Sequence, residues 1–163
     1  MDRALSRLTR DGQIRRVARG VYDLPRLHPR IGALAPSTTV VAKALAHDNH
    51  IQPAAAAAIN VLGLSSQLSA RTLWLTDGPS RTVRIGRLAV ELQHVDPASN
   101  PYLGTPAGMA ISALRHIGQA SVSSAHLAQL AAVLAPVDKA RLRRACRQFP
   151  GWLGAAMQQI AGT

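Results

Sequence analysis

Arginine side chains gathered near the two ends of the chain are the residues whose chemistry is easiest to assign. A guanidinium group can donate paired hydrogen bonds to phosphate or to guanine, whereas a lysine ammonium acts as a point charge. Near the first residue, three arginines recur at a spacing that places them on one helical face, and three more follow within a short hairpin. The sequence therefore predicts DNA contacts by Arg3, Arg7, Arg10, Arg15, Arg16, Arg19, Arg143 and Arg147.

A short helix and a hairpin must position the first six of these arginines. Apolar residues at i, i+3, i+4 and i+7 predict a helix over residues 1–10. The turn residues Asp11, Gly12 and Gly20 flank a predicted strand, and Pro25 ends its partner strand. This order is typical of the end of a winged helix-turn-helix, in which the helix enters the major groove and the wing lies on the phosphates. A solvated basic surface without a ligand is equally compatible with the pattern.

The second group of arginines lies on a helix predicted near the end of the chain. Asp138 is a candidate N-cap of this helix, and Leu142, Cys146 and Phe149 recur at a spacing that places them on its inner face. The outer face would carry Arg141, Arg143, Arg144 and Arg147. A binding patch and a solvated helix face remain alternative interpretations of these charges.

The distribution of charge supports an anionic partner at one or both ends of the chain. The net charge of the 163 residues is +11, and the basic residues include only two lysines, Lys43 and Lys139. Residues 1–30 carry eight basic and three acidic groups, residues 31–100 five and four, and residues 101–163 six and one. The excess is therefore concentrated at both ends, as expected if each end meets nucleic acid or an acidic partner.

Residues suited to catalysis or metal binding are sparse. The eight carboxylates show no paired spacing, and the histidine cluster at residues 47–50 lacks a third ligand nearby. The Ser65-Ser66 pair has no matching histidine motif, and Cys146 lies on a predicted buried face, where a thiol is usually inert. We therefore expect no metal, no cofactor and no enzymatic activity.

The sequence shows no secretory leader and no run of the roughly 20 apolar residues that span a bilayer. A single cysteine fits a reducing compartment. These features predict a cytoplasmic protein with no membrane partner.

The predicted fold class is α+β, with three regions along the chain. Residues 1–25 form a partial winged helix, residues 26–36 a proline-containing linker, and residues 37–163 a helical domain with a small sheet. Strands are predicted at residues 73–76, 82–85 and 88–93, and their short turns favour a three-stranded antiparallel meander covered on one face by the helices that follow. The predicted helices span residues 37–47, 53–62, 107–117, 123–134 and 138–149, with a last one after Pro150.

Three segments carry a resemblance to a known family. They are LSRLTRDGQIRRVARGVYDLP (residues 5–25), IQPAAAAAINVLGLSSQ (residues 51–67) and LTDGPSRTVRIG (residues 75–86). In this order they resemble AbiEi-type antitoxins of type IV toxin–antitoxin systems, and the similarity fades after about residue 118. The resemblance implies an N-terminal winged helix that represses its own promoter and a C-terminal domain that neutralises a nucleotidyltransferase-type toxin. It also implies two helices before residues 5–8, so the winged helix is expected to be partial here, with Met1 inside the recognition helix.

The leading hypothesis is accordingly a DNA-binding antitoxin whose partners are its own promoter and a nucleotidyltransferase-type toxin. The main alternative is a protein-interaction module with a degenerate winged helix that does not bind DNA. An enzyme acting on nucleic acid is the third. Because Leu5 and Leu8 would lack part of their apolar surroundings in a partial winged helix, a homodimer through residues 1–10 is also expected.

Overall fold

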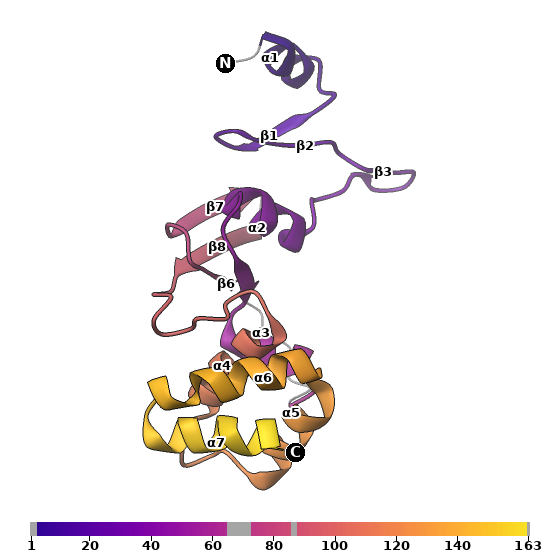
Figure 1. The fold of residues 1–163 in the computed structure, drawn as a ribbon. Coiled ribbons are helices and arrows are strands. Elements are labelled where there is room, and N and C mark those ends of the chain that lie inside the picture. The colour runs from indigo at the N-terminus through magenta and orange to yellow at the C-terminus, as the bar shows by residue number, and fades with distance from the viewer. Residues whose placement is uncertain (1–2, 65–72, 86–87, 163) are drawn as a thin grey trace.

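The computed structural model describes residues 3–64, 73–85 and 88–162. Figure 1 shows an elongated molecule with α1 at one end and the last helices at the other. The helices are α1 (Arg3–Arg10), α2 (Thr38–Ala46), α3 (Ala55–Val61), α4 (Pro106–Ile117), α5 (Ser124–Val133), α6 (Pro136–Ala145), the short 3-10 helix η1 (Cys146–Gln148) and α7 (Gly151–Gly162). The strands are β1 (Arg15–Ala18), β2 (Val21–Asp23), β3 (Leu27–His28), β4 (Gly32–Ala33), β5 (Ile51–Pro53), β6 (Leu73–Thr76), β7 (Arg81–Ile85) and β8 (Leu88–His94). The α+β class predicted from the sequence is confirmed.

The largest sheet has the order β5-β6-β8-β7. β8 runs parallel to β6 and antiparallel to β7, so the prediction of a three-stranded antiparallel meander is wrong. The turn after β6 leads to β7, which is not a neighbour of β6 in the sheet. β8 then occupies the position between β6 and β7. Hydrogen bonds hold the end of β8 against this turn, because His94 N donates to Ser80 Oγ at 2.9 Å and His94 Nδ1 lies 2.9 Å from the Gly78 carbonyl oxygen.

One face of this sheet is buried and the other is exposed. Val90 and Leu92 of β8 are buried, whereas Glu91 and Gln93, which alternate with them, are exposed. The buried face packs against α2 and against the β1–β2 hairpin, which share one hydrophobic cluster with it. The predicted alternation is confirmed, but the expectation that the later helices cover the sheet is wrong, because earlier segments of the chain occupy that face.

The later helices form a hydrophobic cluster of their own. Its buried side chains come mainly from α4, α5, α6 and α7, with Leu62 joining them from the end of α3. Local capping defines two of these helices: Thr105 Oγ1 accepts from Gly108 N before α4, and Ser123 and His126 form a capping box at the start of α5. The ends of α4 and α5 therefore lie close to their predicted positions.

Buried polar side chains connect the two hydrophobic clusters. Gln52 of β5, which is 1% exposed, donates from Nε2 to Ser112 Oγ at 2.8 Å and to the Gly108 carbonyl oxygen at 3.3 Å. Its Oε1 accepts from Gly104 N at 3.2 Å. Asn100 Nδ2 donates to the same two α4 atoms, at 2.9 Å to the Gly108 carbonyl oxygen and 3.1 Å to Ser112 Oγ. The sheet is thus joined to α4 by a shared set of hydrogen bonds.

Two chain segments differ from their predicted conformation. The linker expected at residues 26–36 contains the antiparallel pair β3–β4. Residues Ile51–Pro53, expected to begin a helix, pair with β6 as the edge strand β5. An edge strand tolerates Pro53, because the missing N–H faces away from the ladder.

The predicted role of Asp138 as the cap of its own helix is wrong. α6 begins at Pro136, which suits the first helical turn, with Ala135 at the N-cap. The buried Asp138 carboxylate instead accepts from Ala107 N, at the start of α4, at 3.4 Å, and pairs with Arg141 at 2.8 Å. Asp138 therefore connects α6 to α4.

Candidate nucleic-acid interface

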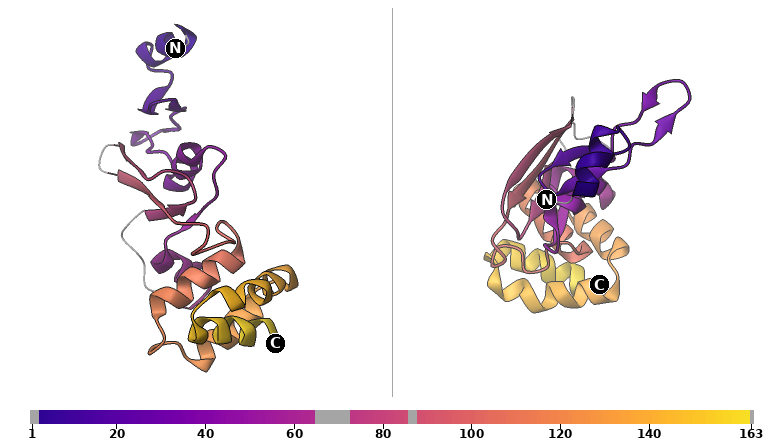
Figure 2. Two further views of the ribbon diagram at one scale, coloured as in Figure 1. Left: turned by 60° about the vertical axis from the view of Figure 1, so that its left-hand side comes forward. Right: turned by 90° about the horizontal axis from the view of Figure 1, so that it is seen from above.

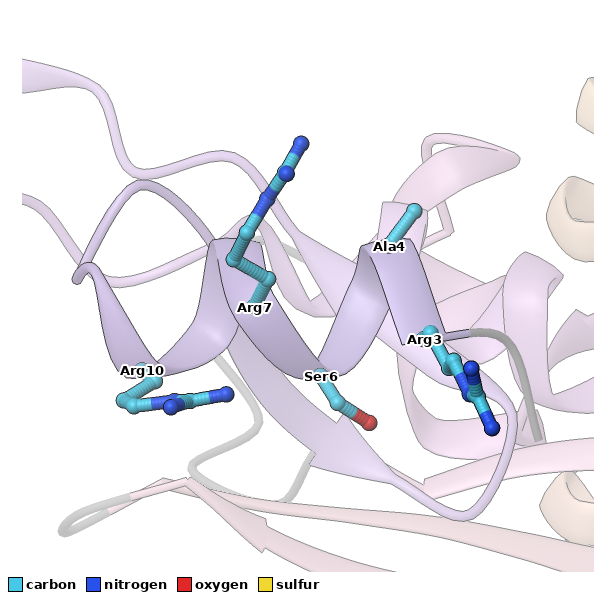
Figure 3. A pocket seen from close by; sticks show the side chains of 5 residues that line it. All are labelled: Arg3, Ala4, Ser6, Arg7 and Arg10. Atoms are coloured by element: carbon cyan, nitrogen blue, oxygen red, sulfur yellow. The ribbon is translucent and has the colours of Figure 1, made fainter.

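α1 presents a basic face to solvent. Arg3, Arg7 and Arg10 are exposed and lie, together with Ala4 and Ser6, on one face of the helix. Figure 3 shows the guanidinium of Arg7 directed to one edge of this face and those of Arg3 and Arg10 to the opposite edge. The three arginines therefore share one helical face, as their spacing predicts, and each edge of that face carries a positive charge. Such an arrangement is suited to two rows of phosphates.

α1 is attached to the rest of the molecule through its carboxyl end. Asp11 N donates to the Arg7 carbonyl oxygen at 2.9 Å and Gln13 N to the Leu8 carbonyl oxygen at 3.0 Å. None of the described residues of α1 is buried, and Leu5 and Leu8 are half-buried. The homodimer expected through residues 1–10 stays a prediction, and Met1 lies outside the described residues.

The β1–β2 hairpin lies at the residues for which a wing is predicted, and its arginines are called the wing arginines below. Arg15 lies opposite Asp23 and Arg16 opposite Tyr22, and a register shift follows before Ala18. Gly20 closes the hairpin with a φ of 78°, a conformation that glycine adopts without strain. Val21 is buried in the sheet cluster, with Val17 and Ala18 packed beside it. The hairpin is therefore anchored by its apolar side, and its tip carries the exposed Arg19.

The three wing arginines have different surroundings. Arg16 and Arg19 are exposed, and Arg16 Nε makes one long contact of 3.4 Å with the Ala18 carbonyl oxygen. Arg15 donates from Nε to Asp23 Oδ2 at 2.6 Å and from Nη2 to the Leu34 carbonyl oxygen. Two sides of the Arg15 guanidinium are thus already occupied by protein atoms, which distinguishes it from Arg16 and Arg19.

The second basic group lies at the opposite end of the molecule from α1 (Figure 1). Arg147 of η1 is exposed. The Nη2 of Arg143 donates to the Ala161 carbonyl oxygen in the last turn of α7, a region where helix carbonyls attract cations. The structure brings Arg3, Arg7, Arg10, Arg16 and Arg19 to one end and separates them from Arg143 and Arg147.

Two basic residues that the sequence analysis did not include also lie in the N-terminal part. Arg26 and Arg30 are exposed on either side of β3. Both lie in the proline-containing segment for which the sequence predicts a linker. The structure shows instead a paired hairpin, which gives the backbone of both residues a defined place.

The described residues contain no group of three or more histidine, cysteine, aspartate or glutamate side chains that could hold a metal ion. None of the helices within the described ranges is long and apolar enough to cross a membrane. The Ser65-Ser66 pair lies outside the described residues.

Comparison with known proteins identifies a family but no named relative. Residues 1–142 match the model of a family of unknown function, DUF6088. No curated protein and no solved structure matches the chain. Since the family model covers most of the 163 residues, from α1 to the middle of α6, the chain belongs to the DUF6088 family.

Proposed function

We propose that this protein is a DNA-binding transcriptional regulator that uses α1 and the β1–β2 wing. The observation that carries the proposal is the set of exposed arginines at one end of the molecule, on a helix and an adjoining hairpin. The acids among residues 3–37 are Asp11 and Asp23, and Asp23 is paired with Arg15. The remaining cations therefore face solvent with little local compensation, which is the electrostatic footprint of a phosphate-binding surface.

The two elements have different tasks in this proposal. α1 enters the major groove, where Arg3 and Arg10 on one edge and Arg7 on the other reach base edges and the flanking phosphates. Arg16 and Arg19 of the wing contact the backbone, which positions the helix without carrying sequence information. Arg15 holds the wing in shape through Asp23 and acts as a positioning residue.

The main test is the salt dependence of binding to the DNA upstream of the gene. Each neutralised phosphate contributes about 0.9 to the slope of log K against log salt, so replacing Arg16 and Arg19 by Ala should reduce the slope by up to about 1.8. Replacing Arg3, Arg7 and Arg10 by Ala should reduce it by up to about 2.7 and remove the preference for promoter over random duplex. Fluorescence anisotropy at several salt concentrations measures both effects.

A matched control comes from the other end of the molecule. The double replacement of Arg115 and Arg144 by Ala removes the same charge as the wing double variant, from exposed sites on α4 and α6 far from α1. The slope of this control should equal that of the unchanged protein. Equal slopes for the wing variant, the α1 variant and the unchanged protein would remove both elements from the interface.

The resemblance to AbiEi-type antitoxins extends the proposal to a protein partner, a toxin of the nucleotidyltransferase type. The part of the molecule available for such a partner is the helical cluster of α4 to α7, which has its own core and lies away from α1. The two activities should therefore separate by mutation. DNA binding and neutralisation would use opposite ends of one chain.

Co-expression with a nucleotidyltransferase-type toxin, sought among the genes adjacent to this one, tests this second activity. The unchanged protein should restore growth of cells that produce the toxin, and the variant with Ala at Arg3, Arg7 and Arg10 should restore it equally, because its helical cluster is intact. Failure of the unchanged protein to restore growth would contradict the antitoxin part of the proposal and leave the DNA-binding part standing.

A further inference from the structure

The β3–β4 hairpin is an arm that projects from the molecule. Figures 1 and 2 show it extending sideways from the body, near the end that carries α1 and the wing. Leu27 pairs with Ala33 and His28 with Gly32, and the backbone N–H of Leu34 closes the base by donating to the Arg26 carbonyl oxygen at 2.8 Å. Every residue from 26 to 33 is exposed. The arm therefore has a defined hairpin conformation although no side chain within it is buried.

The composition of the arm is unusual for a surface hairpin. Leu27 is 79% exposed and Ile31 is 71% exposed, and these apolar side chains lie beside the exposed Arg26 and Arg30. The chain contains no acidic residue between Asp23 and Asp48. Exposed apolar side chains flanked by uncompensated cations fit a partner that presents both anionic groups and apolar walls. The DNA minor groove has this character, with phosphates along its rims and sugars and base edges inside.

The base of the arm is coupled to the proposed wing. Arg15 of β1 bonds to Asp23 of β2 and also to the Leu34 carbonyl oxygen, at the residue that follows β4. One guanidinium therefore holds the wing and the end of the arm together. A duplex contacted by the wing would run close to the arm, so the two hairpins are placed to contact the same DNA.

We propose that the β3–β4 arm reaches the minor groove beside the segment bound by α1 and the wing. Arg30 lies in the groove, where a narrow A·T-rich stretch has an enhanced negative potential. Pro29 and Ile31 at the tip press against a base step, and such apolar wedges partly unstack the bases and bend the duplex. The inference rests on the proposed DNA-binding function and adds to it a second groove and a preference for A·T pairs.

Base substitution in the DNA tests minor-groove contact directly. An inosine·cytosine pair presents the major-groove hydrogen-bonding pattern of guanine·cytosine but lacks the guanine amino group in the minor groove. Changing the A·T pairs next to the footprint of α1 to G·C should weaken binding by about tenfold, and changing them to inosine·cytosine should leave it nearly unchanged. Fluorescence anisotropy gives the affinities, and hydroxyl-radical footprinting locates the protected sugars.

Variants of the protein test whether the arm causes the preference for A·T pairs. Replacing Arg30 and Ile31 by Ala should weaken promoter binding by about tenfold, remove the difference between A·T and G·C flanks, and reduce the bend measured by energy transfer between the duplex ends. The matched control replaces Arg144 and the exposed Val137 of α6 by Ala, which removes one cation and one apolar side chain at the other end. The control should bind, discriminate and bend the DNA as the unchanged protein does.

The possible failures are distinguishable. Salt-dependent promoter binding that is the same for the arm variant and the unchanged protein, with equal sensitivity to flanking G·C pairs, overturns the arm proposal alone. An arm variant that keeps DNA affinity and bend but loses capture of the nucleotidyltransferase assigns the arm to a protein partner and also overturns it. Absence of promoter binding by the unchanged protein overturns the arm together with the proposed function.

Discussion

Replacing Gly108 by alanine should lower the free energy of unfolding by about 3–5 kcal/mol, above the roughly 1–3 kcal/mol that is typical of a single overpacking substitution. A Cβ atom at this position would lie 2.6 Å from the Tyr102 carbonyl carbon and 2.9 Å from Gln52 Oε1, and it would overlap the Tyr102 carbonyl oxygen. The neighbour is mostly backbone, so no side-chain rotation can relieve the overlap. The Gly108 carbonyl oxygen also accepts from Gln52 and Asn100, so a displaced α4 loses these bonds too.

Urea unfolding followed by circular dichroism measures this loss, with Gly151→Ala as the matched control. Gly151 is exposed at the start of α7, and a Cβ there would meet nothing within 4 Å. Alanine at such a helical position should change stability by no more than about 1 kcal/mol, on the stabilising side. Similar effects of the two substitutions would show that the close approach of Tyr102 to α4 does not exist in solution.

Replacing Gln52 by alanine should lower the free energy of unfolding by about 2–4 kcal/mol. The substitution leaves Gly104 N without its side-chain acceptor, removes donors from Ser112 Oγ and the Gly108 carbonyl oxygen, and opens a cavity between the sheet and α4. The Gln52→Leu variant separates these contributions, because leucine restores most of the volume and none of the hydrogen bonds. Both variants should be destabilised, because the Gly108 carbonyl oxygen and Ser112 Oγ each lose one of their two side-chain donors.

Gln93→Ala provides the control for Gln52, since it truncates an exposed glutamine in β8 of the same sheet. Its effect should stay within about 0.5 kcal/mol. A Gln52→Leu variant as stable as the unchanged protein would mean that packing, and not the polar network, joins the two clusters.

Local signals in the sequence predicted several elements correctly. Alternating side chains identified β8, and turn residues bracketed β6 and the β1–β2 hairpin. Ser123 and Gly118 marked helix ends because capping depends on a few neighbouring residues. These features are determined within about ten residues of chain, which is the distance over which a sequence pattern acts on the backbone.

Features that depend on distant residues were not predicted. The insertion of β8 between β6 and β7 leaves the same alternating pattern as a simple meander. The local sequence predicts that Gln52 lies at the start of a helix. Its hydrogen-bond partners are more than 50 residues later in the chain, so the local pattern contains no sign of them. These distant contacts stabilise a strand instead of a helix at Ile51–Pro53 and do not affect the local sequence pattern.

The arginines of the candidate site follow the same division. The helical spacing of Arg3, Arg7 and Arg10 was sufficient to place them on one face. The pairing of Arg15 with the Leu34 carbonyl oxygen and of Arg143 with the Ala161 carbonyl oxygen depends on tertiary structure. Charge alone therefore identified these two residues as candidates without showing that each is held by a backbone carbonyl.

The packing of Val21 against the sheet has a consequence for how the protein is made. The β1–β2 hairpin emerges early from the ribosome, but its cluster includes Val90 of β8, about 70 residues later in the chain. At 5–20 residues per second, roughly 4–14 s pass before that strand has been synthesised. During this interval the arginine-rich segment is a nascent chain without its anchoring surface, close to ribosomal RNA and its phosphates. The basic hairpin can therefore pack on its anchoring surface only after β8 has been synthesised.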